Sequence, residues 1–228
     1  TWANEIIILD SGSTDNTLEI AKKYTNNIHI SDSWPGFGIQ RQNAQKLATS
    51  DWIFMLDADE SISEELKNAI QNATKGELSV YQVNRLSKAF GVEVKHSGWH
   101  PDWINRLYPK NLTTYNDALV HETLIIPKNH LPKKLNGILH HETYQNMKDY
   151  YQKMSLYIDA WSTENINKKP NGVLIGFLRG AWAFFKMYII KLGFLDGRVG
   201  FILAILRFET TTMKYVDIKN KRKNIIEK

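Results

Sequence analysis

Acidic residues follow two short apolar runs in the first third of the chain. The run at residues 5–9 ends on Asp10, and the run at residues 52–56 ends on Asp57, with Asp59 one residue further on. Each run is typical of a buried strand that enters a loop. Two carboxylates one residue apart can direct oxygens at one divalent cation, and Mg²⁺ or Mn²⁺ prefers hard oxygen ligands shared with phosphates. The pattern indicates a metal and phosphate site, although acids are also common in loops and caps.

The elements that must position these acids alternate between strands and helices. A turn-rich segment at residues 11–16 precedes helical spacing at residues 17–24, with Ser13 or Asp15 available as N-cap. A second helix is expected over residues 39–48, and Ser61-x-x-Glu64 is a capping box for a third. This order predicts an α/β fold with a central, mostly parallel sheet. Ligands bind such sheets beyond the carboxyl ends of the strands, where the acids lie.

Composition narrows the class of protein. The chain has 228 residues, 43% of them hydrophobic, and 23% charged, so it can bury a core and is not a disordered or low-complexity chain. Without cysteine it has no disulfide scaffold, thiol nucleophile or cysteine-ligated zinc. Residues 1–5 have neither a basic region nor an apolar region of a signal peptide, so export is not expected.

Charge is unevenly distributed along the chain. Residues 1–167 hold 16 Lys+Arg and 20 Asp+Glu, whereas residues 168–228 hold 13 and 4, a net charge of +9. The basic part is also the most apolar, at residues 172–195 and 200–208. Nucleic-acid binders seldom combine charge with so many large apolar residues, so no nucleic-acid partner is expected.

The basic part is interpreted as a membrane-associating segment. Three cations inside residues 172–195 make spanning costly, at about 2.5–3.5 kcal/mol for each one near the bilayer centre. An amphipathic helix lying in the membrane surface fits better. The competing interpretation is a helix that packs on its own domain or on a second subunit. Two parts are thus expected, a catalytic domain at residues 1–167 and helices at residues 168–228.

An ordered series of motifs lies at residues 8–17, 40–44 and 55–60. This series resembles family 2 glycosyltransferases of the GT-A fold, which bind nucleotide sugars. Later motifs are similar to the bacterial branch that includes lipopolysaccharide inner-core β-1,4-glucosyltransferases: residues 98–102, 106–108, 120–122, 141–144 and 192–197. Members normally begin with one more strand and helix. The resemblance therefore leads us to expect an N-terminally truncated domain, short by about 20–30 residues.

The resemblance implies inverting transfer of a sugar, expected to be glucose from UDP-glucose, to a glycan or lipid-linked acceptor. Asp10 would hold the nucleoside base, Arg41 would face the donor phosphates or uridine, and Asp57 and Asp59 would bracket ribose and a divalent metal, Mg²⁺ or Mn²⁺. A bound cation and an arginine both stabilise a leaving diphosphate. The alternatives are a capping acid for Asp10 and a solvated helix face for Arg41.

Inverting transfer also needs a base, and the resemblance implies Glu122, which lies in an apolar stretch. Its alternative is an ion pair with a nearby lysine. His121 would position the acceptor or a phosphate, and Trp99 would stack on the acceptor sugar; Trp103 and Tyr108 are further stacking candidates, unless these aromatics form local core. Of His140 and His141, the spacing to Tyr144 favours His141 as metal ligand, with a structural histidine as the alternative.

Two other functions are compatible with parts of the sequence. The segment at residues 55–61 also fits the start of haloacid dehalogenase-like phosphatases, with Asp57 as nucleophile, but residues 80–86 and 119–126 lack the paired acids that such enzymes need. The absent first strand would fit a non-catalytic, membrane-binding remnant of a glycosyltransferase. The favoured interpretation is an enzyme of cell-envelope polysaccharide or lipopolysaccharide synthesis. We expect it in the cytoplasm, peripheral on the inner face of the cytoplasmic membrane.

Overall fold

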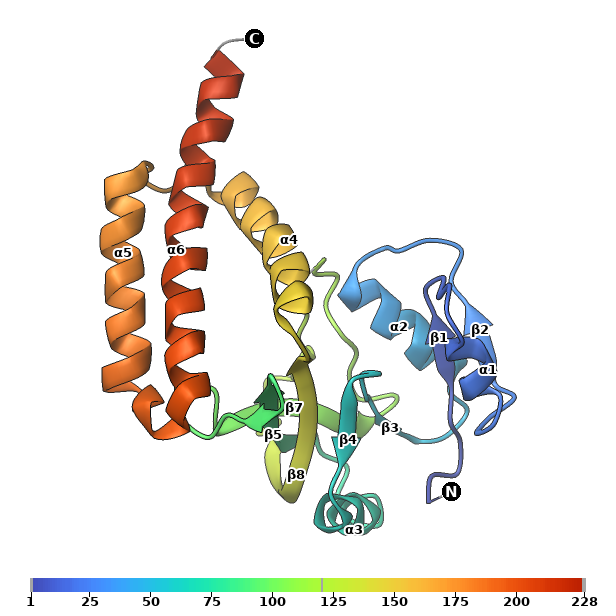
Figure 1. Ribbon diagram of the computed structural model, residues 1–228. Helices are drawn as coiled ribbons and strands as arrows, with labels where there is room; N and C mark the ends of the chain where they lie inside the picture. Colours follow the sequence, from blue (N-terminus) through green and yellow to red (C-terminus); the bar gives the residue numbers. More distant parts are fainter. Residues whose placement is uncertain (1, 120, 227–228) are drawn as a thin grey trace. The chain divides into compact units, whose positions relative to one another are not determined.

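The computed structural model describes residues 2–119 and 121–226 (Figure 1). The chain divides into two compact units, each built from three segments. The first unit comprises Thr1–Ala58, Ile62–Asn84 and Trp103–Leu139, and the second comprises Asp59–Ser61, Arg85–Asp102 and His140–Lys228. Strands and helices are both present in quantity, which confirms the expected α/β class.

The N-terminal strand, helix and strand form a small layer in the first unit. Strand β1 (Ile8–Asp10) pairs in parallel with β2 (Ile28–Ile30), and α1 (Thr17–Ala21) connects them. The N-cap of α1 is Asn16, so the expectation of Ser13 or Asp15 at this position is wrong, although Asp15 Oδ1 accepts the N–H of Thr17 at 3.0 Å. Ser13 bonds to Asp10 instead.

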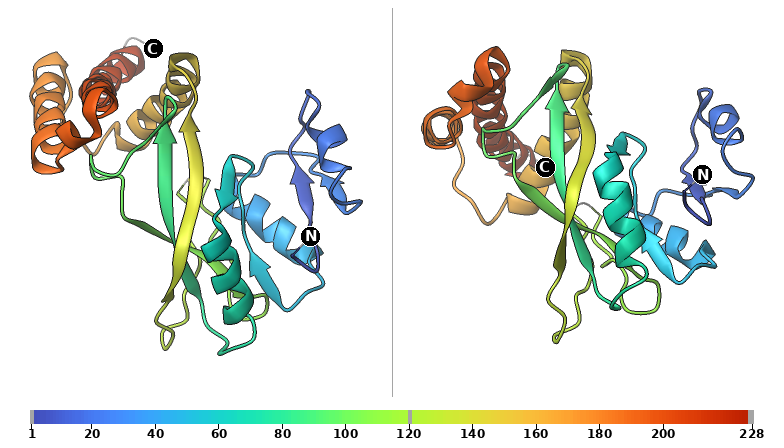
Figure 2. Two further views of the ribbon diagram at one scale, coloured as in Figure 1. Left: turned by 60° about the horizontal axis from the view of Figure 1, so that its bottom comes forward. Right: turned by 90° about the horizontal axis from the view of Figure 1, so that it is seen from below.

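The described residues also form a mixed six-stranded sheet. Its order is β3 (Trp52–Phe54), β7 (Asp102–Pro109), β5 (Tyr81–Ala89), β8 (Lys133–Tyr144) and β4 (Glu60–Ile62), with β6 (Val92–Glu93) on β5. Strands β3 and β7 pair antiparallel, as do β5 and β6. The long strands β5 and β8 lie side by side in both views of Figure 2.

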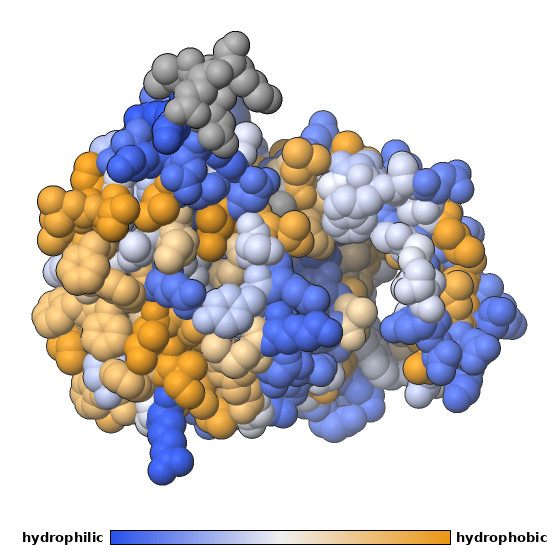
Figure 3. Space-filling view, turned by 45° about the horizontal axis from the view of Figure 1, so that its top comes forward, coloured by the Kyte–Doolittle hydropathy of each residue, from blue (hydrophilic) through white to orange (hydrophobic). Residues whose placement is uncertain are grey.

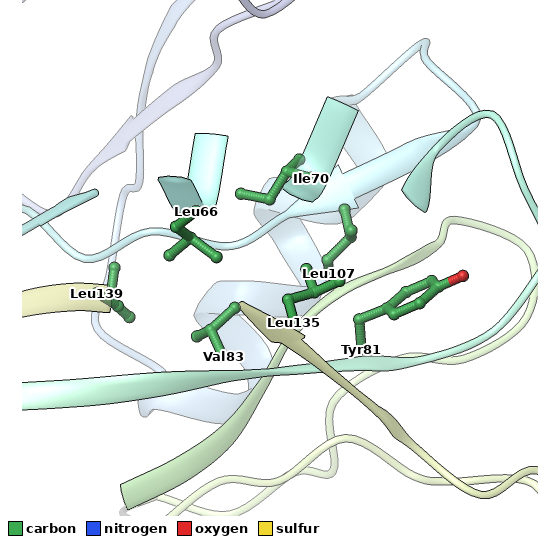
Figure 4. Close-up of a cluster of buried hydrophobic side chains, with 7 residues drawn as sticks. All are labelled: Leu66, Ile70, Tyr81, Val83, Leu107, Leu135 and Leu139. Carbon is green, nitrogen blue, oxygen red and sulfur yellow. The ribbon is translucent and has the colours of Figure 1, made fainter. Parts of the chain in front are cut away.

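Helix α3 (Glu64–Ala73) covers the core of the first unit, into which Leu66 and Ile70 point (Figure 4). Its N-cap is Ser63, whose Oγ accepts the N–H of Leu66 at 3.2 Å. The capping box expected at Ser61 is therefore wrong, because Ser61 lies inside strand β4. Gly137 has φ +95°, and a Cβ there would lie 2.2 Å from the backbone nitrogen of Leu66, so glycine lets β8 approach α3.

Helices make up most of the second unit. Helix α4 (Met147–Asn165) is followed by α5 (Val173–Phe185), the π-helical turn η1 (Lys186–Ile190), the 3₁₀ turn η2 (Gly193–Asp196) and α6 (Gly197–Ile226). Helices α5 and α6 lie side by side as a hairpin (Figure 1). The division expected at residue 167 falls between α4 and α5 and stays a prediction.

Candidate active site

Helix α2 (Phe37–Leu47) places Arg41 beside the segment that carries Glu122. The N–H groups of Phe37 and Gly38 at its first turn donate to the carbonyls of Leu119 at 3.1 Å and Ala118 at 3.0 Å. A Cβ on Gly38 would lie 2.0 Å from the carbonyl oxygen of Asn116, so only glycine fits this approach. Residue 120, between these partners and Glu122, lies outside the described residues.

Two glutamines on the same helix fix the segment further. Gln42 Nε2 donates to the carbonyl of Tyr115 at 2.9 Å, and Gln45 Nε2 donates to those of Lys110 and Thr113 at 2.9 and 2.8 Å. Side-chain amides thereby satisfy carbonyls of an irregular segment that would otherwise be buried without partners. These hydrogen bonds attach residues 110–119, which precede Glu122 in the sequence, to α2.

Arg41 joins two of the expected site residues. Its Nη2 lies 2.7 Å from Asp57 Oδ1, and its Nε donates to Glu122 Oε1 at 2.8 Å. Arg106, on β7, donates through Nη2 to Asp57 Oδ2 at 2.7 Å. The Arg41 guanidinium carbon also lies 5.3 Å from the centre of the Tyr115 ring. Glu122 does form an ion pair, and its partner is Arg41 where a lysine had been expected as the alternative.

The charged side chains of this cluster shift one another's pKa values. Burial by itself would raise the pKa of Asp57, but the positive charges of Arg106 and Arg41 and their hydrogen bonds outweigh it and lower the pKa to about 2. For Arg41, burial and Arg106 work against the charge, yet the bonds with Asp57 leave its pKa raised. The side chains of Arg41 and Glu122 are only 11% and 14% exposed. Asp57 is therefore a firmly ionised carboxylate held by two cations.

Asp10 organises the loop that follows β1. Its Oδ2 accepts the N–H groups of Gly12 and Ser13, each at 2.8 Å, and its Oδ1 accepts the Ser13 hydroxyl. The hydroxyl and N–H of Ser13 lower the pKa of Asp10 most, against a smaller effect of burial, and Gly12 lowers it further. The Asp10 carboxylate thus accepts hydrogen bonds from the loop that follows it. Its assignment to the nucleoside base stays a prediction.

Asp59 and His141 come together in the second unit. Asp59 Oδ2 lies 3.4 Å from His141 Nε2 and 3.9 Å from Lys153 Nζ. The hydroxyls of Thr143 and Ser87 lie 3.1 and 3.3 Å from His141 Nδ1, which orients the ring so that Nε2 is directed at Asp59.

This pair has a donor set that suits Mn²⁺ or Mg²⁺. A carboxylate and an imidazole supply two ligands, and such ions commonly complete their shell with substrate phosphates and water. Within the described part of the chain no group of three or more His, Cys, Asp or Glu side chains could hold a metal. The residues thus fit a metal that is bound together with a phosphorylated ligand, and the assignment stays a prediction.

A pocket of about 320 Å³ adjoins His141 in the same unit. Its lining includes Trp99, Tyr144, Arg85 and Asp102. Arg85 donates to Asp102 through Nε at 2.9 Å, and its Nη2 lies 2.7 Å from the same carboxylate oxygen. Aromatic faces beside a fixed pair of charged groups are suited to a sugar, which offers apolar C–H faces and hydroxyls. Trp99 lines this pocket, and its role in acceptor binding stays a prediction.

The remaining candidates are dispersed. His121 is exposed and has φ 60°, and its role in acceptor binding stays a prediction. His140 Nδ1 lies 3.8 Å from Glu93 and not beside Asp59. Tyr108 is fully buried, so it is core and cannot stack on a sugar. Trp103 lies beneath the Lys134 ammonium, 4.5 Å from the ring centre.

Arg106 has a place in the cluster that sequence reasoning did not assign. It is 5% exposed although it lies in strand β7 among apolar residues. An arginine inside an apolar strand is itself a signal, because a buried guanidinium requires a carboxylate or other acceptors. The partner could not be named from the sequence, because Asp57 lies 49 positions away.

Comparison with known proteins agrees with this architecture. The family model described as Glycosyl transferase family 2 matches residues 3–162, so the chain belongs to that family. This membership and the α/β fold confirm the expected GT-A class. An uncharacterized glycosyltransferase of Rickettsia prowazekii (strain Madrid E) is 26% identical over 98% of this chain and 81% of its own length.

Two further proteins found by comparison have a named role or a solved structure. The lipopolysaccharide core biosynthesis glycosyltransferase LpsC of Rhizobium meliloti (strain 1021) is 24% identical over 89% of this chain and 80% of its own length. The crystal structure of S. aureus TarS residues 1–349 in complex with UDP-GlcNAc has a TM-score of 0.39 and 18% identity, over 91% of this chain and 72% of that one.

Proposed function

We propose that this glycosyltransferase moves a sugar, with inversion, from a nucleoside diphosphate donor such as UDP-glucose to a glycan or lipid-linked acceptor of the cell envelope. The arginine-held pair of Asp57 and Glu122 carries the proposal, because it couples a firmly ionised carboxylate to a candidate base. Similarity to LpsC supports a lipopolysaccharide core acceptor.

The proposed reaction exchanges one bond at the anomeric carbon for another. The acceptor hydroxyl oxygen bonds to that carbon, and the bond to the diphosphate breaks with its electron pair leaving on the phosphate. Glu122 takes the hydroxyl proton. Arg41 holds Glu122 through Oε1, so we assign the proton to Oε2. Arg41 is then a positioning residue. The carboxylates of Asp57 and Glu122 balance its positive charge.

Asp59 and His141 are the residues proposed to hold a divalent metal. When bound, such a cation neutralises the charge that develops on the leaving diphosphate. The Trp99 pocket is assigned to the acceptor sugar, with Asp102 and Arg85 available to its hydroxyls. His121 is assigned to positioning the acceptor, and Asp10 to the nucleoside base.

The test compares Glu122→Gln with wild type in donor binding and in sugar transfer. Loss of a general base should lower transfer by about 10²- to 10⁴-fold while UDP binding is kept. The matched control is Glu77→Gln, because Glu77 is an exposed acid in the same unit whose carboxylate binds Lys133. Transfer at the wild-type rate would contradict the role of Glu122, and a wild-type chain that neither binds nor turns over nucleotide sugars would contradict the function itself.

A further inference from the structure

The hairpin of α5, η1, η2 and α6 carries large apolar side chains that face solvent. We call the following set the apolar face, with exposed fractions between 44% and 71%: Leu174, Leu178, Trp182, Phe185, Ile189 and Leu195. Figure 3 shows hydrophobic residues gathered on the side of the molecule where α5 lies. Water-soluble helices normally turn such residues toward the core.

Small residues explain why the large ones point outward. A Cβ on Gly176 would lie 2.7 Å from the carbonyl oxygen of Thr212, and one on Gly180 would lie 2.7 Å from that of Phe208. Helix α5 thus packs against α6 through glycines four residues apart, which lets the two backbones approach closely. The side of α5 that is turned toward α6 is its small-residue side, and the apolar face lies opposite.

The part of the hairpin that carries the apolar face, which ends before Glu209 and Asp217 of α6, has surface charge of one sign. Residues 168–208 contain seven Lys+Arg and a single acid, Asp196. The Asp196 side chain is only 3% exposed, and it accepts the N–H groups of Lys95 and His96, each at 3.0 Å. Lys186 and Arg198 are exposed. This combination suits anionic lipid headgroups, whereas a second copy of the chain would bring the same positive charge against it.

Length alone would also permit a spanning helix. Val173–Ile190 is the one segment of the described residues that is long and apolar enough to cross a membrane, with a mean hydropathy of 1.5 and 17% of it buried. It contains Arg179 and Lys186, however, and charged side chains near a bilayer centre are costly. A helix that lies in the interface keeps these cations in the headgroup region.

We propose that this hairpin docks on an anionic membrane surface, with the apolar face at the boundary between headgroups and acyl chains. The same hairpin holds the loop that carries Trp99, because Ser97 donates its N–H to the carbonyl of Lys191 at 2.8 Å and its hydroxyl to Asp196 at 2.7 Å. Docking would therefore fix the pocket near the membrane; the link to a lipid-linked acceptor, unlike docking itself, rests on the proposed function.

The test is cosedimentation of the whole chain with vesicles of phosphatidylcholine, with and without phosphatidylglycerol. We expect binding that requires the anionic lipid, weakens as salt rises and is released by carbonate. Lys186→Glu with Arg198→Glu should weaken partitioning roughly fivefold or more for each position. Its matched control is Lys23→Glu with Lys75→Glu, two exposed lysines of the first unit that give the same change in net charge.

The apolar contribution is tested by Leu174→Ser with Leu178→Ser, which should also release the chain from vesicles. Leu131→Ser is the control, since Leu131 is 86% exposed in the first unit. Circular dichroism melting of each variant separates loss of binding from loss of folding. Carbonate-resistant binding would establish a spanning helix, and a dimer without vesicle binding would establish a second copy on this face; either result overturns the proposal, as does equal loss in the control variants.

Discussion

Asp57 carries a charge whose cost of burial is met by two arginines, and this makes its contribution to folding dependent on pH. The folded-state pKa is about 2 against an ordinary 3.8, so the stabilisation is present above about pH 4 and is lost as the pH falls toward 2. We expect Asp57→Asn to lower the free energy of unfolding at neutral pH, by an amount that shrinks below pH 4.

Urea unfolding of both proteins at a series of pH values measures this difference. Because Asp57 is 35% exposed, solvent screening reduces the effect below what the pKa alone implies. A difference between the two proteins that stays constant from pH 6 to the acid limit of folding would contradict the ion-pair account of Asp57.

A separate prediction concerns the proposed metal ligands Asp59 and His141. The adjacent histidine, His140, provides a control one position away in the sequence. Only His141 lies beside Asp59, whereas His140 lies beside Glu93. Asp59→Asn and His141→Ala should each weaken Mn²⁺-dependent UDP binding by about tenfold or more, and His140→Ala should leave it unchanged. Titration calorimetry with UDP, with and without Mn²⁺, measures it. Equal affinities in all four proteins would remove the metal from this site.

Much of the candidate site could be predicted residue by residue, but its connections could not. Strand ends and the family resemblance both selected Asp57, and the resemblance added Arg41 and Glu122. The partners of Arg41 lie 16 and 81 positions away, a separation that local patterns do not encode. Arg41, which was expected to face the donor phosphates or uridine, binds two carboxylates of its own chain, and its role toward the donor stays a prediction.

At the scale of elements, the start of α3 shows that a local sequence pattern can place a helix cap two residues too early. Ser61 and Ser63 both precede an acidic first turn, and the capping-box spacing selected Ser61. Strand β4 extends through Ser61, so the helix begins two residues later, and Ser63 Oγ accepts N–H groups from Leu66 at 3.2 Å and from Ile138 at 3.0 Å. Pairing with a strand more than seventy positions away decided the boundary.

Ser63→Ala should therefore lower the free energy of unfolding by about 1–2 kcal/mol, because it removes both a helix cap and an acceptor for β8. Ser61→Ala, at an exposed strand position, should change it by less than about 0.5 kcal/mol. Chemical denaturation of the two single variants compares them directly. The reverse order of effects would restore Ser61 as the cap.

The direction of strand pairing is the second feature at this scale that the sequence pattern did not predict in full. Alternation of strands and helices predicted an α/β fold correctly and a mostly parallel sheet, and β1 with β2 pairs in parallel. Strands β3 and β7 pair antiparallel across a separation that no short-range pattern reveals. The helices of the C-terminal part were expected from composition, whereas their pairing through Gly176 and Gly180 became visible only in the packing.

At the scale of the molecule, the second unit combines a candidate membrane surface with a candidate sugar pocket. Asp196 connects them, because its carboxylate receives the N–H groups of Lys95 and His96 and the Ser97 hydroxyl just before Trp99. Trp99 also packs against the core that Met187, Val199 and neighbouring side chains of the hairpin form. A substitution of Asp196 should therefore alter the pocket that Trp99 lines while leaving the apolar face unchanged.

We expect Asp196→Ala to keep binding to anionic vesicles and UDP but to lower kcat/KM for the acceptor by about tenfold to a hundredfold, since a misplaced binding group costs about that much. Asp217→Ala is the matched control, because Asp217 is an aspartate of α6 in the same unit whose partners are Ser162 and Lys221 and not the loop. Asp196→Asn, which keeps some acceptors for the loop, should recover part of the rate. Because removal of charged hydrogen bonds also destabilises the fold by about 1.5–3 kcal/mol each, kinetics are measured well below the melting temperature of each variant. Acceptor kinetics equal to wild type, with vesicle binding intact, would show that the hairpin holds the loop without influencing the pocket.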